Sequence, residues 1–211
     1  MEGSLPDGGN VSYTMYYTET EAGTREERED DEYEVRVAYD LTGVLEMDGV
    51  AYAMTGYRMS ETEEERGERE TSEELWIRAT HPDDADTYVQ MNVETGAEEE
   101  DGEQETEREY VYGVYRGGQL VERASIDFET ENEQGGTETE YELSILKDGV
   151  RSRFEVEREQ RSGGTVTIGV NYRVEGGGQG RFTITKTADG EYLYRADDGR
   201  SDNDFDDDFD D

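Results

Sequence analysis

The sequence predicts an all-β fold in which about twelve antiparallel strands follow one another as an up-and-down meander. Apolar side chains alternate with polar ones over many short segments, which is the pattern of strands with one buried face. Glycine-containing turn sequences separate these segments. Helical spacing of apolar residues is sustained nowhere, so no amphipathic helix is expected.

The alternation is clearest in three segments. Residues 34–41 read EVRVAYDL, residues 123–128 read RASIDF, and residues 165–174 read TVTIGVNYRV. In each of them every second side chain is apolar, so one face of the strand is expected to be buried and the other solvated. These three segments fix the antiparallel sheet as the expected architecture.

The turn sequences set the topology. Tight hairpins are expected at Asp48-Gly49, Gly117-Gly118, Asp148-Gly149, Gly163-Gly164, Gly176–Gly178 and Asp189-Gly190, because Asp-Gly and Gly-Gly supply positive φ angles. Long, charged connections are expected at Thr18–Asp31, Ser60–Thr71, Thr95–Glu107 and Thr130–Thr137. Alternate connections of a meander lie at the same end, so the acidic connections should share one rim.

The sheet is expected to form a barrel, a half-barrel or a sandwich. Closure is favoured because an open strand edge pairs readily with other chains. Residues 1–10 are expected to be a lead-in, residues 11–200 a single antiparallel β domain, and residues 201–211 a disordered acidic tail.

The charge of the chain indicates its habitat. It carries 58 acidic and 20 basic residues, for a net charge of -38, and its only lysines are Lys147 and Lys186. In this acid excess and lysine depletion the chain resembles proteins of salt-in halophiles such as haloarchaea. In molar salt the Debye length is about 3 Å, so dense carboxylates barely repel one another. The alternative is an acidic protein of a mesophile that mimics nucleic acid and binds a basic protein.

One motif suggests an enzyme. The stretch His81-Pro82-Asp83-Asp84 resembles the zinc-binding signature of N-acetylglucosaminyl deacetylases, which would make His81 and Asp84 ligands and Asp83 the base. That family's motif continues with Glu where Ala85 stands, and it needs further histidines, whereas His81 is the only one. We therefore reject this interpretation and expect a β-turn with Pro82 inside it.

Other metal and catalytic sites are expected to be absent. The chain has no cysteine, so thiolate sites and disulfides are excluded, and no cofactor is expected. Asp202, Asp204 and Asp206 match the start of a calcium loop, but Asp207 replaces the required glycine. Only low-affinity cation binding is predicted at these three aspartates, and the protein is predicted not to be an enzyme.

Tyrosines are the candidate contact residues. Tyr16, Tyr110, Tyr112 and Tyr115 lie in strand segments rich in tyrosine, where they either pack across strands or contact a partner. A protein partner, self-assembly or an apolar ligand is compatible with such a surface. Direct nucleic-acid binding is not expected, because no basic patch stands out against the acidic background.

Two settings remain open. The charged, Thr- and Glu-rich hairpins look like those of haloarchaeal surface lipoproteins of unknown role, which implies a secreted or cell-envelope binding platform or carrier of an apolar ligand. That location requires a signal segment or lipid anchor ahead of this chain, and no transmembrane segment is expected. The alternative is a tail-tube or capsid-associated protein, found in a virion or in the cytoplasm.

Overall fold

The computed structural model describes residues 2–4, 10–28, 32–47, 49–100, 103–133, 136–161, 163–188 and 190–197. Within these ranges the chain forms thirteen strands and no helix. The strands are β1 (Glu2–Ser4), β2 (Asn10–Arg28), β3 (Glu32–Met47), β4 (Val50–Glu65), β5 (Glu68–His81), β6 (Asp84–Glu100), β7 (Glu103–Arg116), β8 (Gln119–Glu133), β9 (Gly136–Lys147), β10 (Val150–Arg161), β11 (Val166–Val174), β12 (Gln179–Lys186) and β13 (Tyr192–Asp197).

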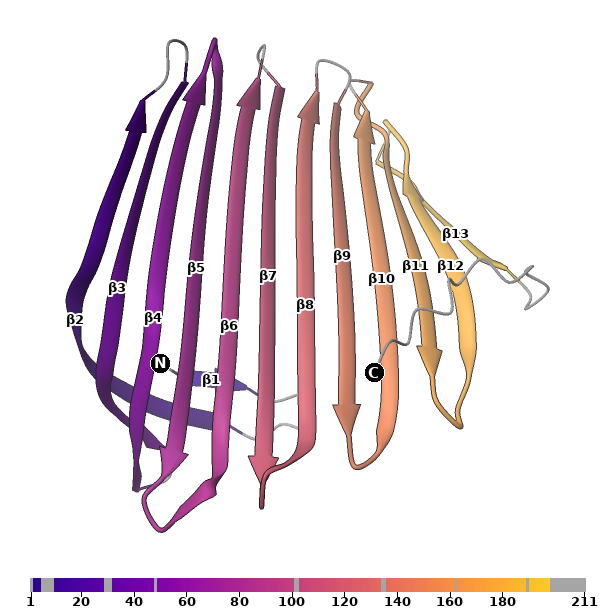
Figure 1. Ribbon diagram of the computed structural model, residues 1–211. Helices are drawn as coiled ribbons and strands as arrows, with labels where there is room; N and C mark the ends of the chain where they lie inside the picture. Colours follow the sequence, from indigo (N-terminus) through magenta and orange to yellow (C-terminus); the bar gives the residue numbers. More distant parts are fainter. Residues whose placement is uncertain are drawn as a thin grey trace.

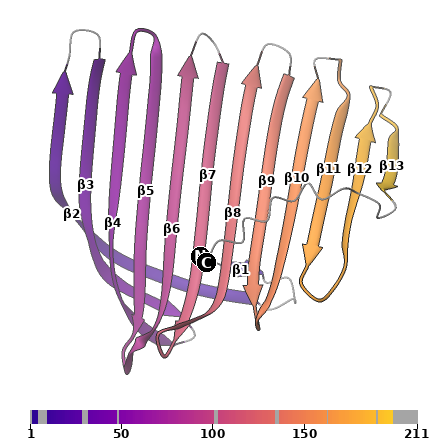
Figure 2. The ribbon, with the colours of Figure 1, turned by 45° about the vertical axis from the view of Figure 1, so that its right-hand side comes forward.

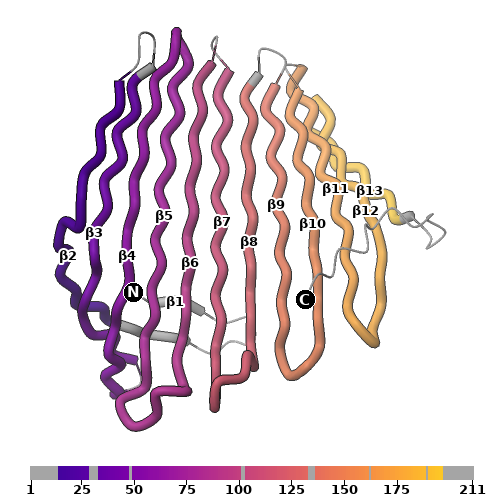
Figure 3. Tube along the Cα trace, viewed as in Figure 1, coloured from indigo at the N-terminus to yellow at the C-terminus, as the bar shows by residue number. Residues whose placement is uncertain are grey.

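The strands pair in the order of the chain, and every pair is antiparallel. Figure 1 and Figure 2 show β2–β13 side by side as one broad sheet, with β1 and the beginning of β2 crossing one side of it. The backbone trace in Figure 3 follows the same succession of hairpins. The predicted all-β antiparallel meander is therefore confirmed.

The sheet is open, so the expected closure is wrong. Its two ends in the strand order are β1–β2 and β13, and these do not pair with each other. Closing a barrel requires strands of matched length and a constant stagger. Here the strands shorten from the 19 residues of β2 to the 6 residues of β13, which cannot line one common seam.

The prediction of long, charged connections is also wrong in part. The predicted loop between Ser60 and Thr71 is a continuation of β4 and β5 around a tight turn at Arg66 and Gly67, whose φ angles are 39° and 106°. Residues Glu61 to Glu65 pair with Ser72 to Glu68 in continuous register. Alternating Thr and Glu can extend a hairpin because a strand needs only backbone partners and a consistent face for each side chain.

The position of these acidic turns agrees with expectation. The connections β2–β3, β4–β5, β6–β7 and β8–β9 all lie at the same end of the sheet, at the top of Figure 1. The tight turns at the opposite end include Gly117-Gly118 and Asp148-Gly149, where all four residues have positive φ. Asp48, Asp189 and the tail 201–211 lie outside the described residues.

The sheet has two faces with different compositions, which the pairing register defines. Residues directly opposite each other on neighbouring strands point to the same face, and we call such a set a row. Face A contains the row that includes Leu75 and Val93, and face B contains the row that includes Glu70 and Glu98. Buried apolar residues occur on face A only, among the residues that the structure describes.

The core lies on face A of β3, β4 and β5. Leu41, Met54, Ile77 and Ala79 are its buried residues, with 1–7% of their surface exposed. Met15 of β2 packs against this cluster, together with Leu75 and Met91. The core is therefore small and off-centre, under the corner where β2 bends.

Two glycines permit that bend. A Cβ atom on Gly43 would lie 2.1 Å from the carbonyl oxygen of Tyr16, and one on Gly56 would lie 2.2 Å from that of Trp76. Both positions belong to face A, opposite Met54 and Ile77 respectively. Glycine is required there because the neighbouring backbone approaches on the inner side of a curved sheet.

Candidate functional site: the two faces of the sheet

Face A carries a continuous apolar surface far beyond the core. Its middle row crosses seven consecutive strands from β5 to β11 without a polar residue, and its members are Leu75, Val93, Tyr110, Ile126, Leu143, Phe154 and Tyr172. The rows on either side add Tyr112 and Phe128. Several aromatic rings here are partly uncovered, with exposed fractions of 39% for Tyr110, 40% for Tyr112 and 36% for Phe128.

The exposure of face A increases toward β13. Phe182 of β12 is 36% exposed, and Tyr192 and Tyr194 of β13 are 57% and 75% exposed. No strand of this chain is packed over this part of face A in the element contacts of the described residues. Ordinary domains bury such a face against a second layer. The described strands provide no such layer in contact with β7–β13.

Face A also has few charges in this region. Its basic residues on β7–β12 are Arg108, Arg116, Lys147, Arg158 and Lys186, and its acid is Glu122, directly opposite Lys147. Both lysines of the chain thus lie on the apolar face. Glu122 lies beside a bulge that places Leu120 on the face opposite to that of Ala124 and Ile126.

Face B is the acidic face. One row contains nine glutamates on nine successive strands: Glu27, Glu34, Glu63, Glu70, Glu98, Glu105, Glu131, Glu138 and Glu159. We call it the glutamate row. Neighbouring strands are about 4.8 Å apart, so each carboxylate between the two ends of the row has like charges on both sides.

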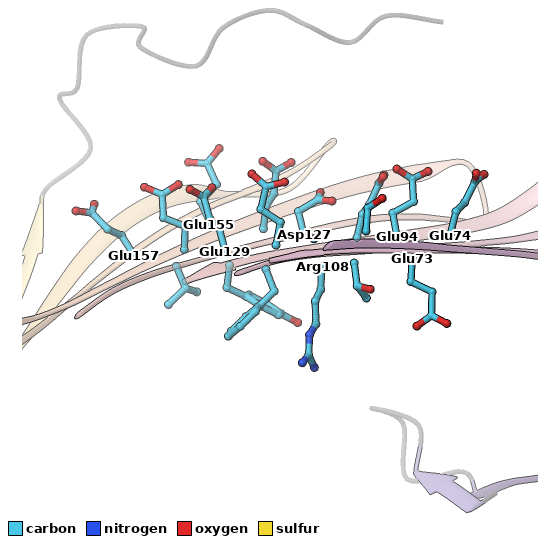
Figure 4. A pocket seen from close by; sticks show the side chains of 18 of the residues that line it. Glu73, Glu74, Glu94, Arg108, Asp127, Glu129, Glu155 and Glu157 are labelled. Carbon is cyan, nitrogen blue, oxygen red and sulfur yellow. The ribbon is translucent and has the colours of Figure 1, made fainter. Parts of the chain in front are cut away.

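A broad cavity of about 900 Å³ lies on this acidic surface. Figure 4 shows Glu94, Asp127, Glu129 and Glu155 rising from one side of the sheet, while Arg108 points to the other side. The picture therefore agrees with the faces assigned from register.

Crowding changes the proton affinity of these acids. Desolvation raises the pKa of Glu105, and its neighbours Glu107 and Glu131 raise it further. Desolvation and the charges of Glu157 and Glu140 do the same to the pKa of Glu138. Each raised pKa means that the ionised carboxylates weaken the folded state.

One group of acids could contact a single cation. Oxygen atoms of Glu105, Glu129 and Glu131 lie within 4.8 Å of one another. Hard cations prefer carboxylate oxygens, so solvent cations would gather at this point. The predicted cation positions Asp202, Asp204 and Asp206 lie outside the described residues.

The His81 motif forms a hairpin turn. His81 pairs with Asp84 at the end of β5 and β6. The backbone N–H of Asp83 donates a 3.2 Å hydrogen bond to His81 Nδ1, and the Thr87 hydroxyl donates one of 2.7 Å to Asp84. The predicted β-turn is confirmed, and these side chains stabilise it.

The four candidate tyrosines do not form one surface. Tyr110 and Tyr112 lie on face A, whereas Tyr16 lies on face B, opposite Val44. Tyr115 also belongs to face B, where its ring stacks on Tyr88 with centroids 4.4 Å apart. Tyr115 is an odd number of residues from Tyr110 and from Tyr112, so the alternation of β7 places its side chain on the other face, and β7 pairs with β6 there without a bulge.

Comparison with known proteins adds no relative: no family model, no curated protein and no solved structure matches this chain. Among the residues that the structure describes, no helix has the length and apolar character needed to cross a membrane.

Proposed function

We propose that this chain is a non-enzymatic binding protein that works through face A, and that the occupant of face A is a second copy of the chain. The observation that carries this proposal is the middle row of face A. It is apolar on seven successive strands, yet aromatic residues in and beside it are more than one-third exposed. An apolar surface of this extent on a soluble domain marks an interaction site.

The total surface supports a missing second layer. The chain of 24.0 kDa exposes 14978 Å². A compact monomer of that mass is expected to expose about 10,000 Å². The excess, about 5,000 Å² for one chain, is larger than the roughly 1,000–2,500 Å² that each partner of an obligate homodimer buries, so it leaves room for such an interface. Two copies packed through face A would form an ordinary two-layer β-sandwich, with the sheets about 10 Å apart.

The charge distribution selects which faces can meet. Packing two B faces would bring two glutamate rows together and desolvate carboxylates that already repel one another. Packing two A faces would bury mainly aliphatic and aromatic side chains and leave both acidic faces in solvent. High salt also strengthens apolar association while it screens the net charge of -38.

The setting we propose is the surface of a halophile. A secreted or cell-envelope location suits a binding platform, and a virion or filament is the alternative for a protein that assembles through sheet faces. Both rest on the acidic, lysine-poor composition of the chain.

Sedimentation equilibrium in molar KCl tests the proposal with two matched variants. Phe182→Asp adds a charge to face A, and Thr183→Asp adds the same charge to face B on the neighbouring residue of β12. We expect the unmodified chain and Thr183→Asp to be dimers and Phe182→Asp to be a folded monomer. A monomeric unmodified chain at every concentration would contradict the proposal.

A second candidate function is the transport of an anionic amphiphile. Five bases against one acid on β7–β12 of face A favour it, because they would attract an anionic head group while the apolar rows hold its tail. Mass spectrometry of organic extracts from the purified protein distinguishes the two candidates. A monomer that retains a stoichiometric lipid supports transport, and a lipid-free dimer supports assembly.

A further inference from the structure

Face B contains a second cavity, of about 870 Å³. The charged residues of its lining are mainly basic, whereas those that line the first cavity are mainly acidic. Its polar lining comprises Arg123, Arg151, Arg153, Arg173, Ser125 and Ser144. We call it the arginine cavity. Its arginines lie on face B, so a ligand bound there does not require that face A be the binding surface.

The register brings these residues together from four strands. Ser125, Ser144, Arg153 and Arg173 form one row across β8–β11. Arg123, Leu146 and Arg151 form the adjacent row across β8–β10. The site is therefore built on the central strands of the sheet, which hold side chains more rigidly than loops do.

The charge contrast between the two cavities is large. The acidic cavity is lined by twelve acidic residues and one arginine. The arginine cavity is lined by four arginines and a single acid, Glu175. The chain has only 20 bases, so four of them at one site is a marked concentration.

Two of the arginines occupy paired positions on neighbouring strands. Arg153 and Arg173 lie directly opposite each other on β10 and β11, and two glutamates offset the charge of Arg153. Arg153 is oriented by Glu142 at 2.8 Å and by Glu155 at 3.2 Å, which both lie in the next row toward the acidic end. These contacts fix the guanidinium of Arg153 at the boundary of the cavity.

The chemistry of the lining selects the ligand. Guanidinium groups bind carboxylate and phosphate oxygens through paired N–H donors, and serine hydroxyls add further donors. Leu120 and Leu146 line the same cavity and offer apolar contact. Its volume lies in the range of small-molecule sites. We propose that the arginine cavity binds an oxyanion group, a phosphate or a carboxylate.

Such a group could come from a free small anion or from the acidic end of this chain. β13 ends at Asp197, which pairs with Arg181 of β12, and β12 is adjacent to β11. Fourteen residues follow Asp197, and eight of these fourteen are Asp. A chain of that length spans about 45 Å when extended, far more than two strand spacings.

Isothermal titration calorimetry in molar KCl tests the site with inorganic phosphate and citrate as probes. The proteins are the full chain, a chain ending at Asp197, the double variant Arg123→Gln/Arg173→Gln in each length, and Arg181→Gln as the matched control outside the cavity. Circular dichroism verifies that each variant is folded.

We expect phosphate or citrate to bind at least one of the two chain lengths at least about tenfold more tightly than it binds the double variant of the same length. The affinity of Arg181→Gln should equal that of the unmodified chain. Binding by both lengths identifies a free anion as the ligand. Binding by the shortened chain alone, with competition from a peptide of residues 198–211, identifies the chain's own end. The proposal is overturned if neither length binds either probe, or if Arg181→Gln loses as much affinity as the double variant.

Discussion

Glu105 of β7 lies directly opposite Glu131 of β8, in the interior of a row of nine glutamates that runs from β2 to β10. A sheet in dilute buffer is destabilised by each such pair. In molar salt the Debye length is shorter than the spacing between neighbouring strands, so the row is tolerated. The register thus gives a structural reason why a chain of this acidic composition would be more stable at high salt.

The first prediction concerns salt. We expect the thermal midpoint to fall as KCl is lowered from molar to tens of millimolar, because screening of the glutamate row is lost. Glu131→Gln should raise the midpoint at low salt by about 2–4 °C and have little effect in molar salt.

The control for this prediction is Glu46→Gln. Glu46 lies between Thr14 and Ala51, so it has no acidic residue directly opposite. Its replacement should leave the salt dependence unchanged. A midpoint that is flat across salt concentrations would contradict both the role of the row and the halophile interpretation.

The second prediction concerns pH. The pKa values of Glu105, Glu129 and Glu138 are raised in the folded state, with desolvation as the first cause and neighbouring acids as the second. The folded state therefore binds more protons than the unfolded state just above the ordinary value of 4.5. Stability should rise as the pH falls through the raised pKa values toward 4.5.

An opposing contribution comes from Glu61. Its pKa is lowered by the hydrogen bonds that it accepts from Arg36, the shortest at 2.7 Å. That stabilisation is lost as the pH falls below 4.5, through the lowered pKa. Urea denaturation at a series of pH values should therefore show maximal stability on the acidic side of neutrality. Stability that only declines from pH 7 downward would contradict this balance.

Much of the fold could be predicted from the sequence. Alternation located the strands, and Gly-Gly and Asp-Gly located the turns at 117–118 and 148–149. The extension of β4 and β5 through Glu61–Glu65 and Glu68–Thr71 was missed, because apolar alternation was the criterion and these residues are polar. Residues 61–65 read ETEEE and residues 68–71 read ERET, so no alternation of apolar residues marks this extension.

The sites were harder to predict, because they depend on register. Tyr110 and Tyr115 were grouped by proximity in the sequence, although they are an odd number of residues apart and strand alternation already assigns them to opposite faces. The arginine cavity was also missed, since Arg123, Arg153 and Arg173 are far apart in the chain. Aligning the hairpins from their turns would have placed Arg153 beside Arg173, because each turn fixes the pairing that follows it.

The third prediction concerns the bend of the sheet. Gly56→Ala should destabilise the protein by about 3 kcal/mol, because the new methyl group would collide with the carbonyl oxygen of Trp76. Gly96→Ala is the matched control, since its Cβ would meet only the Glu107 side chain, at 3.9 Å or more. Its effect should stay within about 1 kcal/mol. Urea titration in molar KCl measures both, and equal effects would contradict the role of Gly56.

The most direct test of face A as the working surface is hydroxyl-radical footprinting of tyrosines at low and high protein concentration in molar KCl. The reporters are Tyr110 and Tyr112 on face A, Tyr16 and Tyr57 on face B, and Tyr194 on the edge strand β13; each is at least 39% exposed in the single chain. We expect oxidation of Tyr110 and Tyr112 to fall several-fold as the concentration rises, while Tyr16 and Tyr57 stay reactive. Protection confined to Tyr194, or equal on both faces, would contradict the account.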